Sequence, residues 1–411
     1  MTRRVVVTGM GMASPIGNSV SEAMESLRAG RHGFSRKDEW DSIDFLRPRL
    51  AAEVKGIDFT AYMPRRERRT MGRVAMLAAY AADQAIADAS LERDDLTSPR
   101  VGLAFGSTEG SSTAESRWRR AIFESGGMRG VAPSDYLKFM SHTCAANLGV
   151  RYGIRGRVIS TCAACISGSQ AVGTGFEAIQ AGLADVMICG GAEEMHFTHA
   201  GIFDIMHAAS TAYNDDPDRA SRPFDEGRDG LVVGEGGGAL VLEERDAARA
   251  RGARVYAEVL GYAITCDGSH MTSPTCDGMR SAMTASLENA GLGAGDIQYI
   301  NAHATATEKG DIAESQAMES IFGSGVPVSS TKSFTGHTLG ACGAIESAFT
   351  IQMMREGWFA PNRTLESLDP RCSELDYVIG RGRELRTSIV MNNNFAFGGI
   401  NTSLIFAAHE E

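Results

Sequence analysis

A strand, a cysteine, a helix and a second strand follow one another between Arg157 and Gly191, and this unit restricts the fold more than any other feature. Residues 157–161 form a β-branched run typical of a buried strand. The segment from Ile166 to Gly182 repeats apolar residues at helical spacing, and residues 184–191 are typical of a second buried strand. Strands joined by a helix over so short a distance predict a right-handed parallel crossover.

Cys165 lies where the first of these strands passes into the helix. Free N–H groups and the helix dipole favour an anion there, so we expect the pKa of the thiol to fall below its usual ~8.5 and to yield a nucleophilic thiolate. The alternative is a small buried cysteine that only packs between helix and strand. Cys162 and Cys165 also form a C-x-x-C, but no second metal-ligand pair accompanies them, so metal binding or disulfide exchange is the weaker interpretation.

Strand-like and helical runs alternate along all 411 residues, which predicts an α/β protein. We expect two halves of similar topology, 1–250 and 251–411. The net charge of −11 argues against nucleic acid as a partner, and no apolar run approaches the ~20 residues of a membrane helix. Eight scattered cysteines and an N-terminal apolar run broken by glycines indicate a cytoplasmic protein with reduced thiols.

Two histidines follow predicted strands in the second half. His303 comes directly after the strand at 297–300, and His337 lies between Lys332 and Glu346, beyond the strand at 326–329. Catalytic groups collect at such strand ends in open α/β sheets. Either histidine alone is more often structural, but together with a cysteine at a helix start they indicate a nucleophilic site.

A dense basic cluster, P-R-R-E-R-R-T-M-G-R at residues 64–73, precedes a helix predicted at 71–89. Such a cluster is usually a solvated helix start. In a chain of this net charge it also offers a positive patch that could orient an acidic partner.

The motifs A-C-I-S-G-S-Q-A, A-H-A-T-A-T-E-K-G-D and T-K-S-F-T-G-H-T-L-G-A occur in this order. With these flanks the chain resembles, over essentially its whole length, the β-ketoacyl-[acyl carrier protein] synthases of the elongating type (I/II). The resemblance implies a thiolase-like fold with an αβαβα layering. It also implies a decarboxylative Claisen condensation, in which an acyl group on Cys165 is attacked by the enolate of a malonyl-carrier to give a 3-oxoacyl-carrier for fatty acid or related polyketide or polyene biosynthesis.

The resemblance assigns roles to individual residues. His303 and His337 would stabilise the enolate, with Lys332 and Glu346 as a supporting ion pair. The backbone N–H groups of Cys165 and Phe397 would form an oxyanion site, and Phe395 and Phe397 would belong to a gating loop. Thr305 and Thr307 would contact the pantetheine arm. The carrier protein would dock on Arg65, Arg66, Arg69 and Arg129. No metal or cofactor is expected, because substrates arrive on the phosphopantetheine arm of an acyl carrier protein. The resemblance implies a homodimer in which each subunit helps to wall the other's acyl pocket, and a heterodimer with a chain-length factor stays open.

Glu109 departs from the family pattern, because fatty-acid enzymes have a small or aliphatic residue at that position, at the far end of the acyl pocket. A carboxylate that faces a saturated chain is costly unless it is paired. We therefore expect an unusual acyl group that is shorter, polar-tipped or an aryl polyene. The alternative is that Glu109 turns to solvent or to an arginine. Further departures are Ala304, Ala306 and Cys342, and Ala396, which should restrict the gating loop.

Two other classes remain as alternatives. A thiolase would carry a second catalytic cysteine near the C-terminus, where this chain has N-N-N-F-A-F-G-G. A non-catalytic chain-length factor would lack the nucleophile, whereas Cys165 and both histidines are present.

Overall fold

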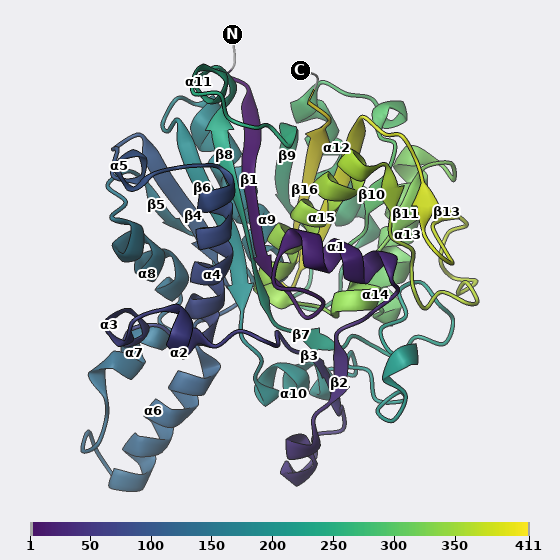
Figure 1. Ribbon diagram of the computed structural model, residues 1–411. Helices are drawn as coiled ribbons and strands as arrows, with labels where there is room; N and C mark the ends of the chain where they lie inside the picture. Colours follow the sequence, from purple (N-terminus) through teal and green to yellow (C-terminus); the bar gives the residue numbers. More distant parts are fainter. Residues whose placement is uncertain (1–2, 410–411) are drawn as a thin grey trace.

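The computed structural model describes residues 3–409, and one eleven-stranded sheet runs through this part of the chain (Figure 1). Its strand order is β13-β11-β10-β15-β16-β9-β1-β8-β6-β4-β5. The strands, in chain order, are β1 (Val5–Ala13), β4 (Val101–Gly106), β5 (Val158–Ser160), β6 (Val186–Glu193), β8 (Gly236–Glu244), β9 (Ala257–Cys266), β10 (Ile300–Asn301), β11 (Pro327–Ser329), β13 (Asp376–Tyr377), β15 (Ile389–Ala396) and β16 (Ile400–Ala407).

The two halves of the sheet repeat one pattern, as predicted. Read outward from the centre, β1, β8, β6, β4 and β5 are the first, fifth, fourth, second and third of their half in chain order. Without the two-residue edge strand β13, which has no counterpart in the first half, β9, β16, β15, β10 and β11 have the same order. In each half two antiparallel pairs are followed by two parallel pairs, and in the second half β13 adds a third parallel pair with β11. The halves join where β1 pairs with β9 through only three residues. The boundary at residue 250 itself stays a prediction.

Helices form three layers around these two half-sheets, which gives the predicted αβαβα arrangement. The middle layer consists of α9 (Ser167–Gln180) and α15 (Cys342–Glu356), which contact each other as well as β6 and β8. One outer layer holds α4 (Arg73–Asp88) and α8 (Thr143–Tyr152), and the other holds α12 (Cys276–Ala290) and α13 (Glu308–Phe322). Each layer has its own buried apolar cluster.

Glycines allow the middle layer to pack tightly. A Cβ at Gly238, in the G-E-G-G-G run, would lie 2.6 Å from the backbone nitrogen of Ile345, and one at Gly168 would lie 2.7 Å from that of Ala344. The glycine at position 238 of this run therefore allows two backbones to pack closely. The first contact brings α15 against β8, and the second brings it against α9, which follows Cys165.

The remaining elements surround this core. The helices are α1 (Val20–Arg28), α2 (Phe59–Tyr62), α3 (Arg65–Arg68), α5 (Arg93–Leu96), α6 (Ser112–Ser125), α7 (Pro133–Phe139), α10 (Phe197–Ile205), α11 (Arg245–Ala250) and α14 (Lys332–Thr335). Two small sheets are formed by β2 (Phe34–Arg36), β3 (Leu50–Ala52) and β7 (Val233–Gly234), and by β12 (Trp358–Phe359) and β14 (Arg383–Glu384). Within residues 3–409, no helix combines the length and the apolar character that crossing a bilayer requires.

The predicted burial of one strand is wrong. The run at 157–161 does form β5, and β4 lies between β5 and β6 with parallel pairing on both sides. However, β5 is the outermost strand, and Val158 and Ser160 are exposed instead of buried. A β-branched run typical of a core strand therefore has an open hydrogen-bonding edge.

Candidate active site

Cys165 occupies a tight turn between β5 and α9. A short 3₁₀ helix, Ala164–Ile166, holds it directly ahead of the first residue of α9. The preceding residue, Ala164, has a left-handed φ of 49°, which non-glycine residues rarely adopt and which is typical of strained functional turns. The side chain is 6% exposed. The predicted position at a helix start is confirmed.

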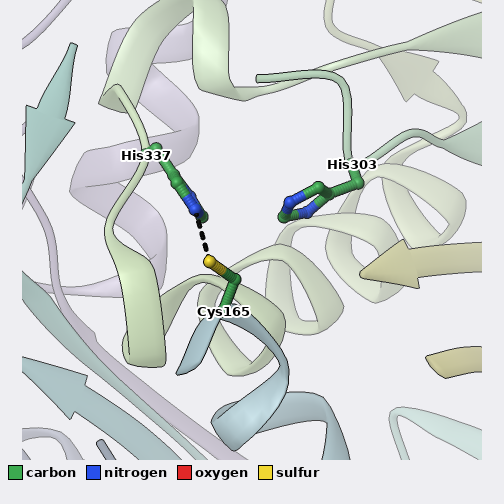
Figure 2. A group of neighbouring side chains, drawn as sticks. All are labelled: Cys165, His303 and His337. Carbon is green, nitrogen blue, oxygen red and sulfur yellow. Dashed lines mark hydrogen bonds between the residues drawn. The ribbon is translucent and has the colours of Figure 1, made fainter. Parts of the chain in front are cut away.

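The two histidines converge on the sulfur from the other half of the chain (Figure 2). His337 Nε2 lies 2.9 Å from Cys165 Sγ. The main chain of His337 is held from both sides, because its N–H donates to Val232 O at 2.8 Å and its carbonyl accepts from Gly234 N at 2.8 Å. Its Nδ1 is buried without a hydrogen-bond partner among residues 3–409.

His303 faces His337 across the site. The carboxylate of Glu314 fixes its backbone, accepting from His303 N at 2.8 Å and from Ala304 N at 2.7 Å. The ring Nδ1 lies 3.5 Å from the amide Nδ2 of Asn394. Because that amide nitrogen is a donor, Nδ1 accepts and the ring proton sits on Nε2.

The expected low pKa of Cys165 is wrong. Burial raises the pKa of the thiol to about 12, although the cation of Lys332 opposes this effect. Burial also lowers the pKa of both histidines well below the usual value, and Lys332 lowers both further. Desolvation therefore outweighs the helix dipole, and the resting site holds a neutral thiol beside two neutral imidazoles.

Lys332 and Glu346 form the predicted ion pair. Lys332 Nζ lies 2.5 Å from Glu346 Oε1, with the two side chains 1% and 2% exposed. Burial is the largest single influence on the pKa of Lys332 and lowers it, but Glu346, Cys342 and Glu314 together raise that pKa overall. Asn394 Nδ2 donates to the other carboxylate oxygen at 2.7 Å. The pair therefore supports the site through Asn394, which links it to His303.

A cavity of about 450 Å³ opens onto these three residues. Its wall includes Cys165, His303, His337 and all four pantetheine and gating residues predicted, Thr305, Thr307, Phe395 and Phe397. The two threonine hydroxyls lie 3.1 Å apart. Phe395 is buried edge-on to His303, whereas Phe397 is 36% exposed and packs on Phe203 of α10 with ring centroids 5.4 Å apart. Ala396 ends β15 opposite Ile400 in ordinary extended pairing.

Glu109 does not line this cavity. Its carboxylate accepts from Ser112 Oγ and lies 3.1 Å from His199 Nε2, and the bond with His199 is the main reason that its pKa is lowered. The partner is a histidine and not the arginine of the alternative prediction. His199 is itself buried on α10, one turn before Phe203.

The predicted docking arginines are all on the surface. Arg65 and Arg66 begin α3, Arg69 caps it, and Arg129 lies between α6 and α7. The only acidic neighbour among them is Glu67, 3.9 Å from Arg66, in the part of the chain that the structure describes. Their charge is therefore free to face a partner.

Four contributors were missed in the sequence: Phe203, His199, Glu314 and Asn394. Asn394 had a visible signal, because three consecutive asparagines are unusual in a strand. The other three lie on helices where nothing in the local pattern separates them from ordinary core or surface residues.

The same site has donors that could hold a metal ion. One ligand atom each of Cys165, His303 and His337 lies within 4.8 Å of the others, as do those of His303, Cys342 and Glu346. Cys162 belongs to neither group, and its thiol donates to Ser141 O at 2.6 Å. Cys162 and Cys165 therefore do not act together as a metal-binding or disulfide pair, and both thiols are free.

Comparisons with known proteins agree with this geometry. Residues 2–248 match the family described as beta-ketoacyl synthase, N-terminal domain, and residues 256–366 match its C-terminal domain. The chain is 38% identical to 3-oxoacyl-[acyl-carrier-protein] synthase 2 of Synechocystis, covering 99% of both chains, and 37% identical to 3-oxoacyl-[acyl-carrier-protein] synthase 1 of Haemophilus influenzae, covering 98% of both.

Solved structures give the same result. A beta-ketoacyl synthase from Burkholderia phymatum is 46% identical with a TM-score of 0.96, over 99% of this chain and 100% of that one. A type II polyketide ketosynthase solved with its acyl-carrier protein is 29% identical, with a TM-score of 0.89 and full coverage of both chains. A ketosynthase solved with its chain length factor, from Xenorhabdus doucetiae, is 25% identical, with a TM-score of 0.84 and coverage of 99% and 98%. This chain therefore belongs to the beta-ketoacyl synthase family.

Proposed function

We propose that Cys165, His337 and His303 perform the family's reaction in this chain. That reaction is the decarboxylative condensation of a malonyl-[acyl carrier protein] with an acyl thioester, giving a 3-oxoacyl-[acyl carrier protein]. The observation that carries the proposal is the convergence of one thiol and two neutral imidazoles on a cavity of about 450 Å³.

In the first half-reaction the thiol must lose its proton as it attacks. Cys165 donates its proton to His337 Nε2 at 2.9 Å while the sulfur attacks the carbonyl of the incoming acyl thioester. The backbone N–H groups of Cys165 and Phe397 donate hydrogen bonds to the negatively charged tetrahedral oxygen. The carbon–sulfur bond to the carrier arm then breaks, the arm leaves with the proton held by His337, and the acyl group stays on Cys165.

In the second half-reaction a malonyl-carrier loses CO₂. His303 Nε2–H donates to the thioester oxygen, where the enolate charge develops. His337 Nε2 donates there as well after its ring proton moves from Nδ1 to Nε2, because Nε2 passed the thiol proton to the leaving arm in the first half-reaction. The enolate carbon attacks the acyl carbonyl and the bond to the Cys165 sulfur breaks. The departing thiolate takes up one proton from solvent, which balances the negative charge that the malonyl carboxylate brought in. Thr305 and Thr307 position the pantetheine arm, and these steps need neither a metal nor a bound cofactor.

Chemical labelling tests this function directly. Iodoacetamide or cerulenin should modify Cys165, as located by mass mapping, and should abolish condensation. A preformed acyl-enzyme at Cys165 should protect it. Modification of Cys162 in place of Cys165, or full activity after modification of Cys165, would refute the assignment.

We assign docking of the acyl carrier protein to the arginines of α3, with Arg129 as a second contact. Carriers present an acidic helix, and Arg65, Arg66 and Arg69 are exposed. The ketosynthase neighbour that is solved with its carrier supports a carrier partner.

We assign the subunit interface to the open edge of β5. Val158 is 47% exposed on a strand that pairs on one side only, and an antiparallel copy of β5 would extend the sheet across a two-fold axis. A homodimer is the primary proposal. The neighbour solved with a chain length factor supports a heterodimer as the second proposal.

Because all eight cysteines are free, we assign the protein to the cytoplasm.

We propose that the acyl substrate is not a long saturated chain. Glu109 forms a hydrogen-bonded group with His199 and Ser112 one helical turn from Phe203. A shorter, polar-tipped or aryl-polyene acyl group avoids placing alkane carbon against that group. A panel of acyl carriers tests this: C12–C16 saturated chains should be extended more slowly than short, polar or conjugated ones, and equal rates would contradict it.

A further inference from the structure

An apolar surface lies on the outer side of α10, next to the mouth of the catalytic cavity. Phe197, Ile202 and Ile205 of this helix are 38%, 49% and 76% exposed. The inner side of the same helix contributes Ala200 and Phe203 to the buried cluster around Cys165. One short helix therefore separates the nucleophile from an exposed apolar face.

Phe45 extends this surface from a second element. Its side chain is fully exposed, and its backbone has a left-handed φ of 61°. The loop that carries it is fastened to α10, because Arg47 N donates to Asp204 Oδ2 at 2.9 Å and Leu46 packs in the Cys165 cluster. An exposed aromatic ring gives up the free energy of burial, and a left-handed backbone costs conformational free energy. A residue that carries both costs is typical of one kept for binding.

The surface, which we name the α10–Phe45 patch (Phe45, Phe197, Ile202 and Ile205), is continuous with the rim of the cavity. Met206 and His207 follow Ile205 directly and line the cavity. Across the opening Met271 also lines it and is 69% exposed. Whatever fills the cavity from outside must therefore lie over or beside the patch.

The charges around the patch are mixed. Arg47 is exposed but ion-paired with Asp204 at 2.7 Å, and Lys309 is an exposed cation. The acidic groups are Asp44, which is exposed, and Glu308, which is paired with Arg371. Lys309 is therefore the exposed cation at this margin that an acidic side chain of a partner could pair with, beside a mainly apolar contact face.

We infer that the α10–Phe45 patch is an apolar docking site for the acyl carrier protein, in addition to the arginines of α3. This rests on the proposed function, because the thioester arm that reaches Cys165 is covalently tethered to the carrier. In Figure 1 α3 lies well apart from α10, so the patch and the arginines are separate surfaces. A second copy of the chain is assigned to the edge of β5 and is not the occupant of the patch.

The test compares carrier binding with small-substrate chemistry. The double variant Phe45→Asn, Ile205→Gln removes the two most exposed members, and asparagine tolerates the left-handed backbone. Ile379→Gln, at an exposed isoleucine beyond β13, is the control. Binding of fluorescent phosphopantetheinylated carrier by anisotropy needs no turnover. We expect the Kd to rise about tenfold in the double variant and to stay within about twofold in the control.

Condensation with an acyl-pantetheine thioester in place of the acyl-carrier gives the second readout. The double variant should keep this activity, because the small substrate does not reach the patch. Unchanged carrier affinity, or equal losses with carrier-bound and small substrates, would overturn the inference. A change in oligomeric mass of the double variant would also overturn it, by assigning the patch to a second copy. Failure of the wild-type enzyme to condense any substrate would refute the proposed function and leave the binding result to decide the docking site.

Discussion

The imidazole of His303 stands edge-on to that of His337, with ring centroids 5.1 Å apart and ring planes at 87°. This crossing lets the two Nε2 atoms approach one point without stacking the rings. His337 Nε2 lies against the sulfur of Cys165, and Asn394 supports the opposite side of the His303 ring. The geometry suits two donors that share one developing oxyanion.

Substituting Cys165→Ala should separate the two half-reactions. We expect condensation to fall by about a thousandfold or more, because no acyl-enzyme can form. Decarboxylation of malonyl-carrier should persist, since both imidazoles remain. Product formation measures condensation, and CO₂ release from labelled malonyl-carrier measures decarboxylation. Loss of condensation and decarboxylation together in a folded variant would contradict the division of roles.

The pH dependence of alkylation should reveal the raised pKa of Cys165. Only the thiolate reacts, and with a pKa of about 12 its fraction rises about tenfold per pH unit throughout pH 6–9. Iodoacetamide rate constants, read at Cys165 by mass spectrometry, should therefore increase without a plateau. A plateau near pH 7 would mean that the helix dipole outweighs burial after all.

Asn394→Ala should weaken the action of His303 specifically. Without the amide donor at Nδ1 the ring no longer holds its proton on Nε2 alone. We expect malonyl decarboxylation to slow roughly tenfold while acylation of Cys165 from an acyl-carrier keeps its rate. Stopped-flow acylation and CO₂ release are the two measurements. Equal slowing of both would indicate general damage, for example through the lost contact with Glu346.

Reversing charge on α3 should affect only carrier-bound substrates. For Arg65→Glu, Arg66→Glu we expect the KM for acyl-carrier to rise about tenfold at low salt, with alkylation of Cys165 unchanged. Arg381→Glu, Arg386→Glu reverses two exposed charges elsewhere and should leave that KM unchanged. An equal rise in both variants would assign the effect to net charge.

Placing a charge on the open sheet edge should dissociate the dimer. Val158→Lys introduces a cation where two copies of β5 would meet, and light scattering should give the monomer mass. Ile379→Lys is the matched control and should leave the mass unchanged. A dimer that survives Val158→Lys would exclude β5 as the interface.

The residues that the sequence identified are those embedded in distinctive flanks. Cys165, His303, His337 and the pair of Lys332 and Glu346 each lie in a motif that also dictates the local turn, so position and neighbours were predictable together. The link between Glu109 and His199 spans 90 residues of chain and two elements, and no local pattern contains it.

Two errors share one physical cause. The β-branched residues at 157–161 predict a buried strand. This pattern cannot distinguish a strand that is buried within its own chain from one that is buried against a second chain. Likewise the helix start at Cys165 predicted an acidic thiol, whereas the neighbours that desolvate the sulfur come from distant segments. Both quantities depend on what surrounds a residue in space, which the local sequence does not contain.

The repeated strand order has a consequence for where chemistry arises in this molecule. Cys165 lies between β5, the third main-sheet strand of its half, and α9, while His337 lies between β11, the third of the other half, and α15. The counterpart of Cys165 in the second half is Gly340, because each is the middle residue of a 3₁₀ helix that begins with a left-handed residue, Ala164 or Leu339, and leads directly into α9 or α15. His337 lies three residues before Gly340 on the same connection, and the two connections meet because α9 and α15 pack against each other. The pseudo-symmetric fold thus brings two similar turns together, and the reaction centre is asymmetric because one turn carries a thiol where the other carries a glycine.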